Sequence, residues 1–482
     1  MRKDKATTSI ISKLIESASL QVVNFIVGII LARLLSPSDY GIYSILLIFI
    51  SIGQTFIISG FNSALIQQKN VLEEDFSSVF VFSIYLAIFI YILIFVCSPF
   101  ISNIYNNSGI TTPLRIISTV LFPSILYSLV YAKVARDMDF AFAAKISIFS
   151  VTSAGLIGII LAISGTGIWA LVIQQILTYT IFPFLYCIKK KWVPKLYFNK
   201  KRFKPLFNYG SRILISDLIN SVYSNIQGII IGIKYNTNSL AFFNKGQLLP
   251  RTIMITINES IQSVLFPVYS DMQDDKKRMA KVLLKNMEII SFIVFPIMIG
   301  IFVTSDQIIT ILLTEKWIEC SYIVKVFCIA YMFWPIDSMN LQAIKASGNG
   351  NTYLYLNSIK KIFAAIILFL FVIKSTSVEM FSISAIVIYI SDILINSIVI
   401  NKEIAVSLFM EIRSIWKSAC CASFLFIINF IPKMTDSIFL DLTFRIFLGI
   451  FIYVVASVIL NRDCFKNVIN LIMKLLSRKS KG

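Results

Sequence analysis

Six charged side chains of this 482-residue chain stand out as mid-span charges of long apolar segments. They are Arg212, Asp217, Arg251, Glu259, Asp337 and Asp392. Inside a bilayer each would cost about 2.5–3.5 kcal/mol, so their presence calls for a reason. Carboxylates at that depth could titrate a coupling proton or bind Na⁺, and guanidinium groups could hold an anion. Alternatively, the charges neutralise one another or reach the interface. Function is favoured for Asp217, Arg251 and Glu259, and both interpretations stay open for the other three.

Further polar side chains follow the same segments. One stripe at three- and four-residue spacing lies on a single helical face, and consists of Asp217, Asn220, Ser221, Ser224 and Asn225. Such a stripe can line a hydrated cavity or hold helices together, and the acid within it favours a cavity. The predicted cavity residues outside the stripe and the six charges are Asn24, Arg33, Lys234 and Lys245. Arg33 and Lys234 could equally anchor their helices at the interface.

The elements that position these residues are about fourteen apolar segments, each long enough to cross the hydrocarbon core as a helix. They do not alternate apolar and polar residues, which argues against a membrane barrel. The predicted spans are 14–35, 41–63, 77–101, 112–132, 142–164, 167–188, 206–233, 240–268, 286–304, 321–344, 354–373, 379–400, 414–432 and 441–460. The sequence therefore predicts an all-α, polytopic membrane protein.

The basic residues sort to one side of this zigzag. Of the 44 Lys and Arg residues, 33 fall in alternate loops and in the two ends of the chain. These stretches are 1–13, 64–76, 132–146, 189–204, 271–285, 345–361, 401–417 and 461–482. Cytoplasmic loops carry the excess of basic residues, so both termini are predicted to be cytoplasmic. The net charge of +19 then reflects orientation and attraction to anionic lipid, and nucleic acid is not expected as a partner.

The basic segment 189–204 divides the predicted spans. We expect an N-terminal six-helix lobe at 1–188, a cytoplasmic linker at 189–204 and a second six-helix lobe at 205–400. Two extra helices and a basic tail follow at 401–482. Short matches at an offset of about 200 residues suggest parallel repeats, an arrangement in which two bundles rock around a central site.

Several kinds of chemistry are disfavoured by composition. The chain has no histidine, which removes histidine proton relays and histidine-containing zinc sites. Its seven cysteines are scattered and form no C-x-x-C pair, so apolar packing is the expected role. No Gly-rich phosphate loop or nucleophile–base pair occurs. We therefore expect neither an enzyme nor a bound cofactor.

Seven stretches in order along the chain resemble the polysaccharide flippases of the Wzx type, within the multidrug/oligosaccharidyl-lipid/polysaccharide exporter superfamily. They are 34–43, 60–67, 135–140, 165–172, 264–270, 312–317 and 340–348. The chain departs from the family at Leu240-Ala241-Phe242-Phe243, where Leu-Gly-Tyr-Tyr is common. Beyond about residue 365 only the hydropathy matches.

The resemblance implies a protein of the bacterial cytoplasmic membrane. It would move an undecaprenyl-diphosphate-linked oligosaccharide from the inner to the outer leaflet by alternating access, for surface polysaccharide biosynthesis. Its partners would be this substrate, membrane lipids and the glycan polymerase and export machinery, with H⁺ or Na⁺ as the coupling ion. The alternative is a cation-coupled multidrug or small-molecule exporter of the same superfamily.

Overall fold

The computed structural model describes residues 2–348, 350–433 and 435–479. Within those ranges the chain forms helices and turns and no β-strand, which confirms the all-α prediction. The packing of the helices divides the chain into two compact units, residues 1–241 and 242–482, and each unit is described by itself.

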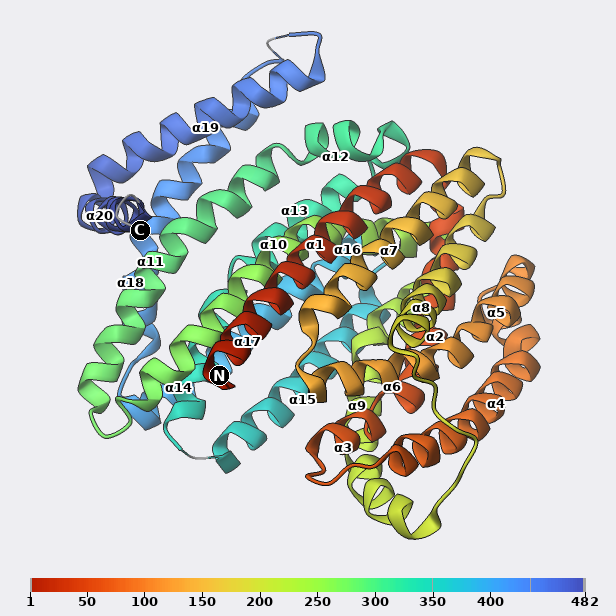
Figure 1. Cartoon of the computed structure of the whole chain (residues 1–482). Helices are drawn as coiled ribbons and strands as arrows, with labels where there is room; N and C mark the ends of the chain where they lie inside the picture. Colours follow the sequence, from red (N-terminus) through yellow and green to blue (C-terminus); the bar gives the residue numbers. More distant parts are fainter. Residues whose placement is uncertain (1, 349, 434, 480–482) are drawn as a thin grey trace. The chain divides into compact units, whose positions relative to one another are not determined.

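The first unit is built around long helices that run side by side, with α1 along α7 and α7 along α8 (Figure 1). Tyr186 and Phe182 of α8 pack there against Val130 and Val134 of α6. The elements of this unit are α1 Arg2–Leu34, α2 Pro37–Ile58, α3 Phe61–Gln67, α4 Glu73–Ile104, η1 Ser108–Ile110, α5 Thr111–Ile117, η2 Ser118–Val120, α6 Leu121–Asp137, α7 Phe140–Ile163, α8 Ile168–Lys190 and α9 Lys200–Lys234.

The second unit packs α11 against α18, and packs α17 against α13, α14 and α15. Helix α10 begins in the last residues of the first unit and continues into the second. The elements of this unit are α10 Thr237–Ser270, α11 Lys276–Val303, α12 Ser305–Leu313, η3 Glu315–Trp317, α13 Cys320–Tyr331, α14 Trp334–Ala346, α15 Gly350–Lys374, α16 Val378–Ser382, α17 Ser384–Ile404, α18 Leu408–Ser423, η4 Phe424–Phe430, α19 Ile438–Leu460 and α20 Arg462–Lys479.

Eleven helical segments of the described chain are long and apolar enough to cross a membrane. They correspond to eleven of the predicted spans. The other three predictions fall on α9, on α10 and on α18 with η4, which are helical but do not meet the same length and composition requirements. The count of fourteen spans therefore stays a prediction, and α9 and α10 stand out as long helices of unusual polarity.

The predicted break after the first span is a helix N-cap. The Ser36 hydroxyl accepts from the Asp39 N–H at 3.2 Å, and Asp39 Oδ2 accepts from the Ser36 N–H at 3.1 Å. These two bonds satisfy backbone donors that the first turn of α2 would otherwise leave open. At the other end of α2, Gly60 has a φ of 72°, and an added Cβ would lie 2.2 Å from the Gly210 carbonyl oxygen. This glycine therefore allows α9 to approach the α2–α3 corner closely.

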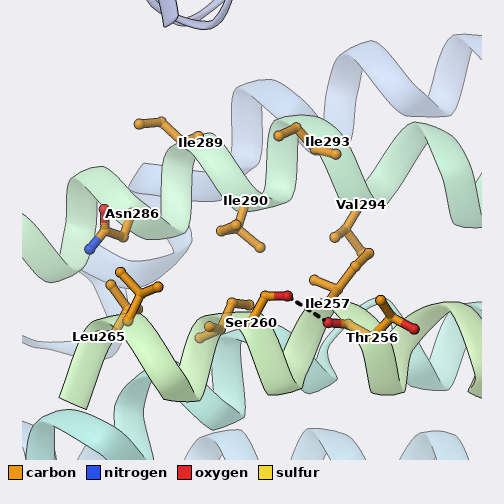
Figure 2. A pocket seen from close by; sticks show the side chains of 11 residues that line it. Thr256, Ile257, Ser260, Leu265, Asn286, Ile289, Ile290, Ile293 and Val294 are labelled. Carbon is orange, nitrogen blue, oxygen red and sulfur yellow. Dashed lines mark hydrogen bonds between the residues drawn. The ribbon is translucent and has the colours of Figure 1, made fainter. Parts of the chain in front are cut away.

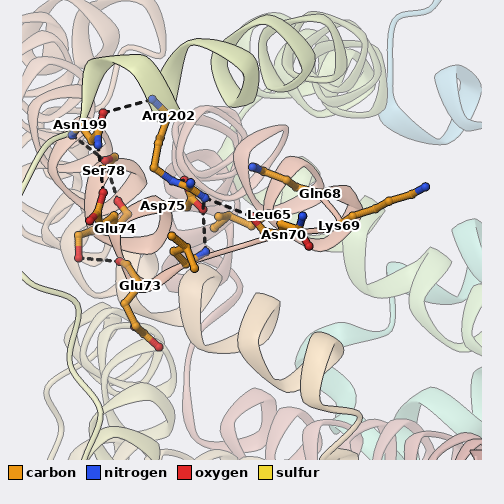
Figure 3. Close-up of polar contacts among 12 residues, drawn as sticks. Leu65, Gln68, Lys69, Asn70, Glu73, Glu74, Asp75, Ser78, Asn199 and Arg202 are labelled. Atoms are coloured by element: carbon orange, nitrogen blue, oxygen red, sulfur yellow. Dashed lines mark hydrogen bonds and ion pairs between the residues drawn. The ribbon is translucent and has the colours of Figure 1, made fainter.

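The basic segment between α8 and α9 is fixed to the start of α4. Arg202 forms two hydrogen bonds with the buried Asp75, at 2.8 and 2.6 Å, and a third with the Asn70 carbonyl at 3.1 Å (Figure 3). The Asn199 amide donates to Glu74 at 3.0 Å. Trp192 donates to Glu73 at 2.7 Å. Three acids at the N-terminus of α4 thus hold one basic segment of the chain.

The packing of α9 places this helix in the first of the two units. This helix lies against α2, α3 and α4 and belongs to the first unit. The sequence pattern assigns residues 205–234 to the start of the second lobe, because the polar segment 189–204 precedes them. The observed division comes one helix later, and the arrangement as two six-helix lobes stays a prediction.

A buried ion pair closes the irregular end of η4 in the second unit. Arg445 Nε lies 2.8 Å from Asp441 Oδ2, and both side chains are almost fully buried. The two other guanidinium nitrogens donate to the Ile428 and Ile431 carbonyls at 2.9 and 3.0 Å. Arg445 thereby supplies donors to backbone oxygens that the end of η4 leaves without helical partners.

Arg445→Met should destabilise the protein by about 3 kcal/mol, because it leaves Asp441 as an uncompensated buried charge. The measurement is the apparent unfolding temperature of the purified protein in detergent. The double variant R445M/D441L should recover part of the loss, because no charge is then left unpaired.

Lys325→Gln is the matched control. Its partner Asp306 lies 2.9 Å away but is more than half exposed. Burial alone would raise the pKa of Asp306, but hydrogen bonds from Ser321 and Lys325 and the Lys325 charge together lower it. An exposed pair contributes at most about 1 kcal/mol. Equal losses of unfolding temperature in K325Q and R445M would contradict the role of Arg445 in a stabilising buried ion pair.

Candidate functional site

The predicted stripe on α9 divides into two faces in the first unit. Asp217 accepts a hydrogen bond from the Ser59 hydroxyl at the end of α2. The Asn225 amide donates to Ser51 Oγ of α2 at 3.0 Å and to the Ser221 carbonyl at 2.8 Å. All three stripe residues on this face are partly buried. Asp217 and Asn225 bind α9 to α2, which is the helix-packing role of a polar stripe.

The second face of α9 is exposed. Asn220 and Ser224 lie on it, and Ser224 donates to the Asn220 carbonyl at 2.8 Å. This exposed side of α9 is here called the α9 arc. Beside Asn220 and Ser224 it becomes apolar, since Ile215 is 60% exposed and Ile219 is 61% exposed. The polar and apolar parts of this arc predict different surroundings, water for the first and lipid for the second.

The other predicted residues of the first unit lie elsewhere on its surface. Arg212 is exposed earlier on α9. Lys234 is exposed at the end of α9, with its Nζ 5.3 Å from the Tyr235 ring centroid. Asn24 and Arg33 are exposed on α1. Of the residues predicted in this unit, Asp217 and Asn225 bond α2, and Ser221 is partly buried on the same face of α9.

Helix α10 carries an exposed polar face in the second unit. Arg251 and Glu259, both predicted from the sequence, are exposed on it. Between and beyond them lie further exposed or half-buried polar side chains, namely Thr252, Thr256, Ser260, Gln262 and Ser263. Lys245 is half-buried earlier on the same helix, within electrostatic range of Cys320 on α13. A helix with this face is better suited to water than to lipid.

An apolar groove borders the polar face of α10, and Thr256 and Ser260 belong to both. Its volume is about 390 Å³, and its walls are α10 and α11 (Figure 2). It is lined by Thr256, Ile257, Ser260, Ile261, Val264, Leu265, Asn286, Ile289, Ile290, Ile293 and Val294. Its few polar groups are partly bonded within the helix, since Ser260 donates to the Thr256 carbonyl at 2.9 Å. The groove is thus an apolar surface beside a polar one.

The two predicted acids near the inner boundary meet in the interior of the second unit. Asp337 of α14 and Asp392 of α17 both face the ammonium of Lys360 on α15, at 2.5 and 3.8 Å. Tyr389 lies one turn before Asp392 and within electrostatic range of both acids and of Arg251. Its ring contacts those of Tyr331 and Trp334. Arg251, Asp337 and Asp392 therefore share one neighbourhood.

Sequence reasoning missed the cation at the centre of this cluster. Lys360 belongs by position to the inner stretch 345–361, although it also falls inside the predicted span 354–373. That overlap is the signal that could have found it. Also missed were Asn396, which is fully buried beside Asp337, and the pair of Asn340 with Glu411 at 3.2 Å. A polar residue within an apolar span gives no sign of its partner, because the partner lies on another helix.

The chain belongs to the polysaccharide biosynthesis protein family, whose model matches residues 30–322, more than half of its length. It is 26% identical over 308 residues to the teichuronic acid biosynthesis protein TuaB of Bacillus subtilis, covering 63% of this chain and 64% of TuaB. It is 22% identical over 307 residues to the lipopolysaccharide biosynthesis protein WzxC of Escherichia coli, covering 62% and 61%. The chain thus spans less than two thirds of these relatives.

The fold is similar to that of the lipid II flippase MurJ in an inward closed conformation. The TM-score is 0.73 at 18% identity, and the match covers 95% of this chain and 100% of that one. The match extends beyond residue 365, where sequence motifs offer no guidance. The resemblance stated from the sequence is confirmed at the level of the polysaccharide biosynthesis family, and the fold is confirmed as that of a polytopic, all-α membrane protein.

The two parts of the α9 arc can be told apart by chemical labelling. In a variant without the native cysteines, Ser224→Cys and Asn220→Cys should react quickly with a water-soluble, membrane-impermeant maleimide. Ile219→Cys should react slowly, because a thiol must ionise in water to act as a nucleophile. The measurement is the labelling rate in membrane vesicles, with full labelling after denaturation as the control. Equal rates at all three positions would show that the polar part of the arc is not hydrated.

Proposed function

We propose that the protein is a flippase that carries an undecaprenyl-diphosphate-linked oligosaccharide from the inner to the outer leaflet by alternating access. Its place would be the bacterial cytoplasmic membrane, with both termini in the cytoplasm. The observation that carries this proposal is the polar face of α10 with Arg251 and Glu259 exposed on it. Membership of a polysaccharide biosynthesis family supports it.

The headgroup sets the first requirement. A diphosphate and its sugars cannot enter about 30 Å of hydrocarbon without partners for their charges and hydroxyls. Arg251 is exposed, and its planar guanidinium can bind a phosphate through two parallel hydrogen bonds. On the same helix, Lys245 would add positive charge. In the first unit, Arg212, Lys234 and Arg33 remain proposed charge partners, and Asn24, Asn220 and Ser224 remain proposed partners for sugar hydroxyls.

The polyprenyl chain sets the second requirement. It is apolar and stays in lipid or in an apolar groove while the headgroup crosses. The groove between α10 and α11 is apolar over most of its lining and lies on the helix that carries Arg251. One amphipathic molecule could therefore contact both surfaces of α10. We assign this groove to the first isoprene units of the substrate.

The alternative is a cation-coupled exporter of small molecules. Such a protein would use the same polar helices but would have no need of an apolar groove beside them. Changed drug resistance with normal surface glycan in a deletion strain would favour it. Under the flippase proposal, H⁺ or Na⁺ drives the cycle, and the glycan polymerase and export machinery take up the product.

Arg251→Gln should lower translocation about tenfold to a hundredfold, because hydrogen bonds to charged groups contribute about 1.5–3 kcal/mol. The measurement is the transfer of a fluorescent undecaprenyl-diphosphate oligosaccharide across proteoliposome membranes, together with accumulation of the lipid-linked intermediate in cells. The matched control is Arg413→Gln, an exposed arginine on α18. Wild-type transfer by R251Q, inserted at normal levels, would remove Arg251 from the site.

Ser260→Phe should slow transfer of the full-length lipid, because the new ring fills part of the groove. A substrate analogue with a short lipid chain should be affected less. Leu248→Phe is the control, since Leu248 is exposed on the same helix but neither lines the groove nor belongs to the polar face. If S260F slows both lipids equally, or if L248F has the same effect, the groove does not hold the tail.

A further inference from the structure

The interior of the second unit holds a cluster with the donor chemistry of a cation site. Lys360, Asp337 and Asn396 are each at least nine-tenths buried. The Lys360 ammonium lies 2.5 Å from Asp337 Oδ1 and 3.8 Å from Asp392 Oδ2. The Asn396 amide donates to the same Asp337 oxygen at 2.7 Å. Carboxylate and amide oxygens are the ligands that hard cations prefer.

Two oxygen atoms of this cluster lack a hydrogen-bond partner within the described residues. Asn396 Oδ1 and Asp392 Oδ1 are both buried, and neither has a hydrogen-bond partner among the residues that the structure describes. A buried oxygen without a partner costs roughly 1–3 kcal/mol, more if charged. Native structures rarely keep such groups without a reason such as a function or an unseen ion or water.

The charges of the cluster do not balance. One ammonium faces two carboxylates, which leaves one negative charge when both are ionised. The groups around it are Tyr331 of α13, Tyr389 of α17 and, at longer range, Arg251 of α10. From α18, Glu411 bonds Asn340, one turn after Asp337, and brings another acid. An unbalanced charge in a buried site is costly, so a proton or a cation is needed.

We propose that Lys360 is a tethered cation. Its ammonium fills a monovalent-cation position built by Asp337 and Asp392, while the Asn396 amide N–H holds Asp337, and one proton on Asp392 neutralises the charge that remains. Both Lys360 and Asn396 donate to Asp337 at short distance. Asp392 takes the proton because its nearest cation is farther away and one of its oxygens has no partner within the described chain.

The site would make the second unit responsive to protons and indifferent to Na⁺. Loss of the proton leaves Asp392 as a carboxylate and releases H⁺ to water, and the ammonium of α15 is then attracted to α17 as well as to α14. Binding of the proton removes that attraction. A role of this exchange in driving transport rests on the proposed function, whereas the site itself does not.

The test uses purified protein in lipid vesicles without substrate. Infrared difference spectra recorded against pH should contain the carbonyl band of a protonated carboxylic acid, and Asp392→Asn should lose it. The same spectra of Glu411→Gln separate the signal of that acid. Lys285→Gln, which alters the exposed pair with Glu288, should keep the band. Absence of a titrating band in the wild-type protein, or its persistence in D392N, would overturn the proton assignment.

A second measurement tests the tethered cation. Lys360→Ala should acquire a saturable rise in unfolding temperature with NaCl over choline chloride at equal ionic strength, because bound ligand stabilises the folded state. The wild-type protein and Lys285→Ala should show no such difference. Stabilisation of the wild type by Na⁺, or no response of folded K360A, would refute the idea. If K360A does not fold, the infrared spectra and the wild-type response to Na⁺ decide.

Because neither measurement involves translocation, this inference and the proposed function can fail separately. A titrating Asp392 in a protein that moves no glycan would retain the site and reject the flippase. Active transfer by a protein without that infrared band would retain the flippase and reject the proton site.

Discussion

The cost of placing charge in hydrocarbon governs the polar residues of this chain. A charged side chain at depth needs an opposite charge, hydrogen-bond donors or water. Arg445 and Asp441 meet this requirement internally, and Arg445 also supplies donors to two backbone carbonyls. Lys360 and Asp337 do so as well, within a larger cluster. Arg251 and Glu259 lie exposed on α10, so water or a ligand must meet their requirement.

In the second unit, the buried cluster of Lys360 and Asp337 lies near the exposed Arg251 of α10. Tyr389 is within electrostatic range of Arg251 on one side and of Asp337 and Asp392 on the other. An anion bound at Arg251 would offset the positive charge that this neighbourhood now receives from it. Proton occupancy at Asp392 would respond, because nearby charges change the balance between its two states. Coupling between headgroup and proton thus needs only a shared electrostatic environment.

The sequence was informative where local rules decide the structure. Eleven predicted spans coincide with apolar helices, and the break at Ser36 and Asp39 is a capping box. It was less informative where partners come from distant parts of the chain. The pattern on α9 predicts one cavity wall, yet Asp217 and Asn225 bond α2. Periodicity identifies a face but cannot say which neighbour meets it.

The same limit explains why the sequence did not identify Lys360 as part of the cluster. A basic residue close to a span's inner end follows the positive-inside rule, and the rule gives no reason to examine it further. Only the packing of α15 against α17 and α14 turns that lysine inward, onto two acids that hydropathy already marks as anomalous. Two acids in separate spans demand compensation, so an otherwise ordinary lysine in a third span is the group to examine. Lys360 and the two acids are therefore linked by the balance of charge across three spans, and not by a motif within one span.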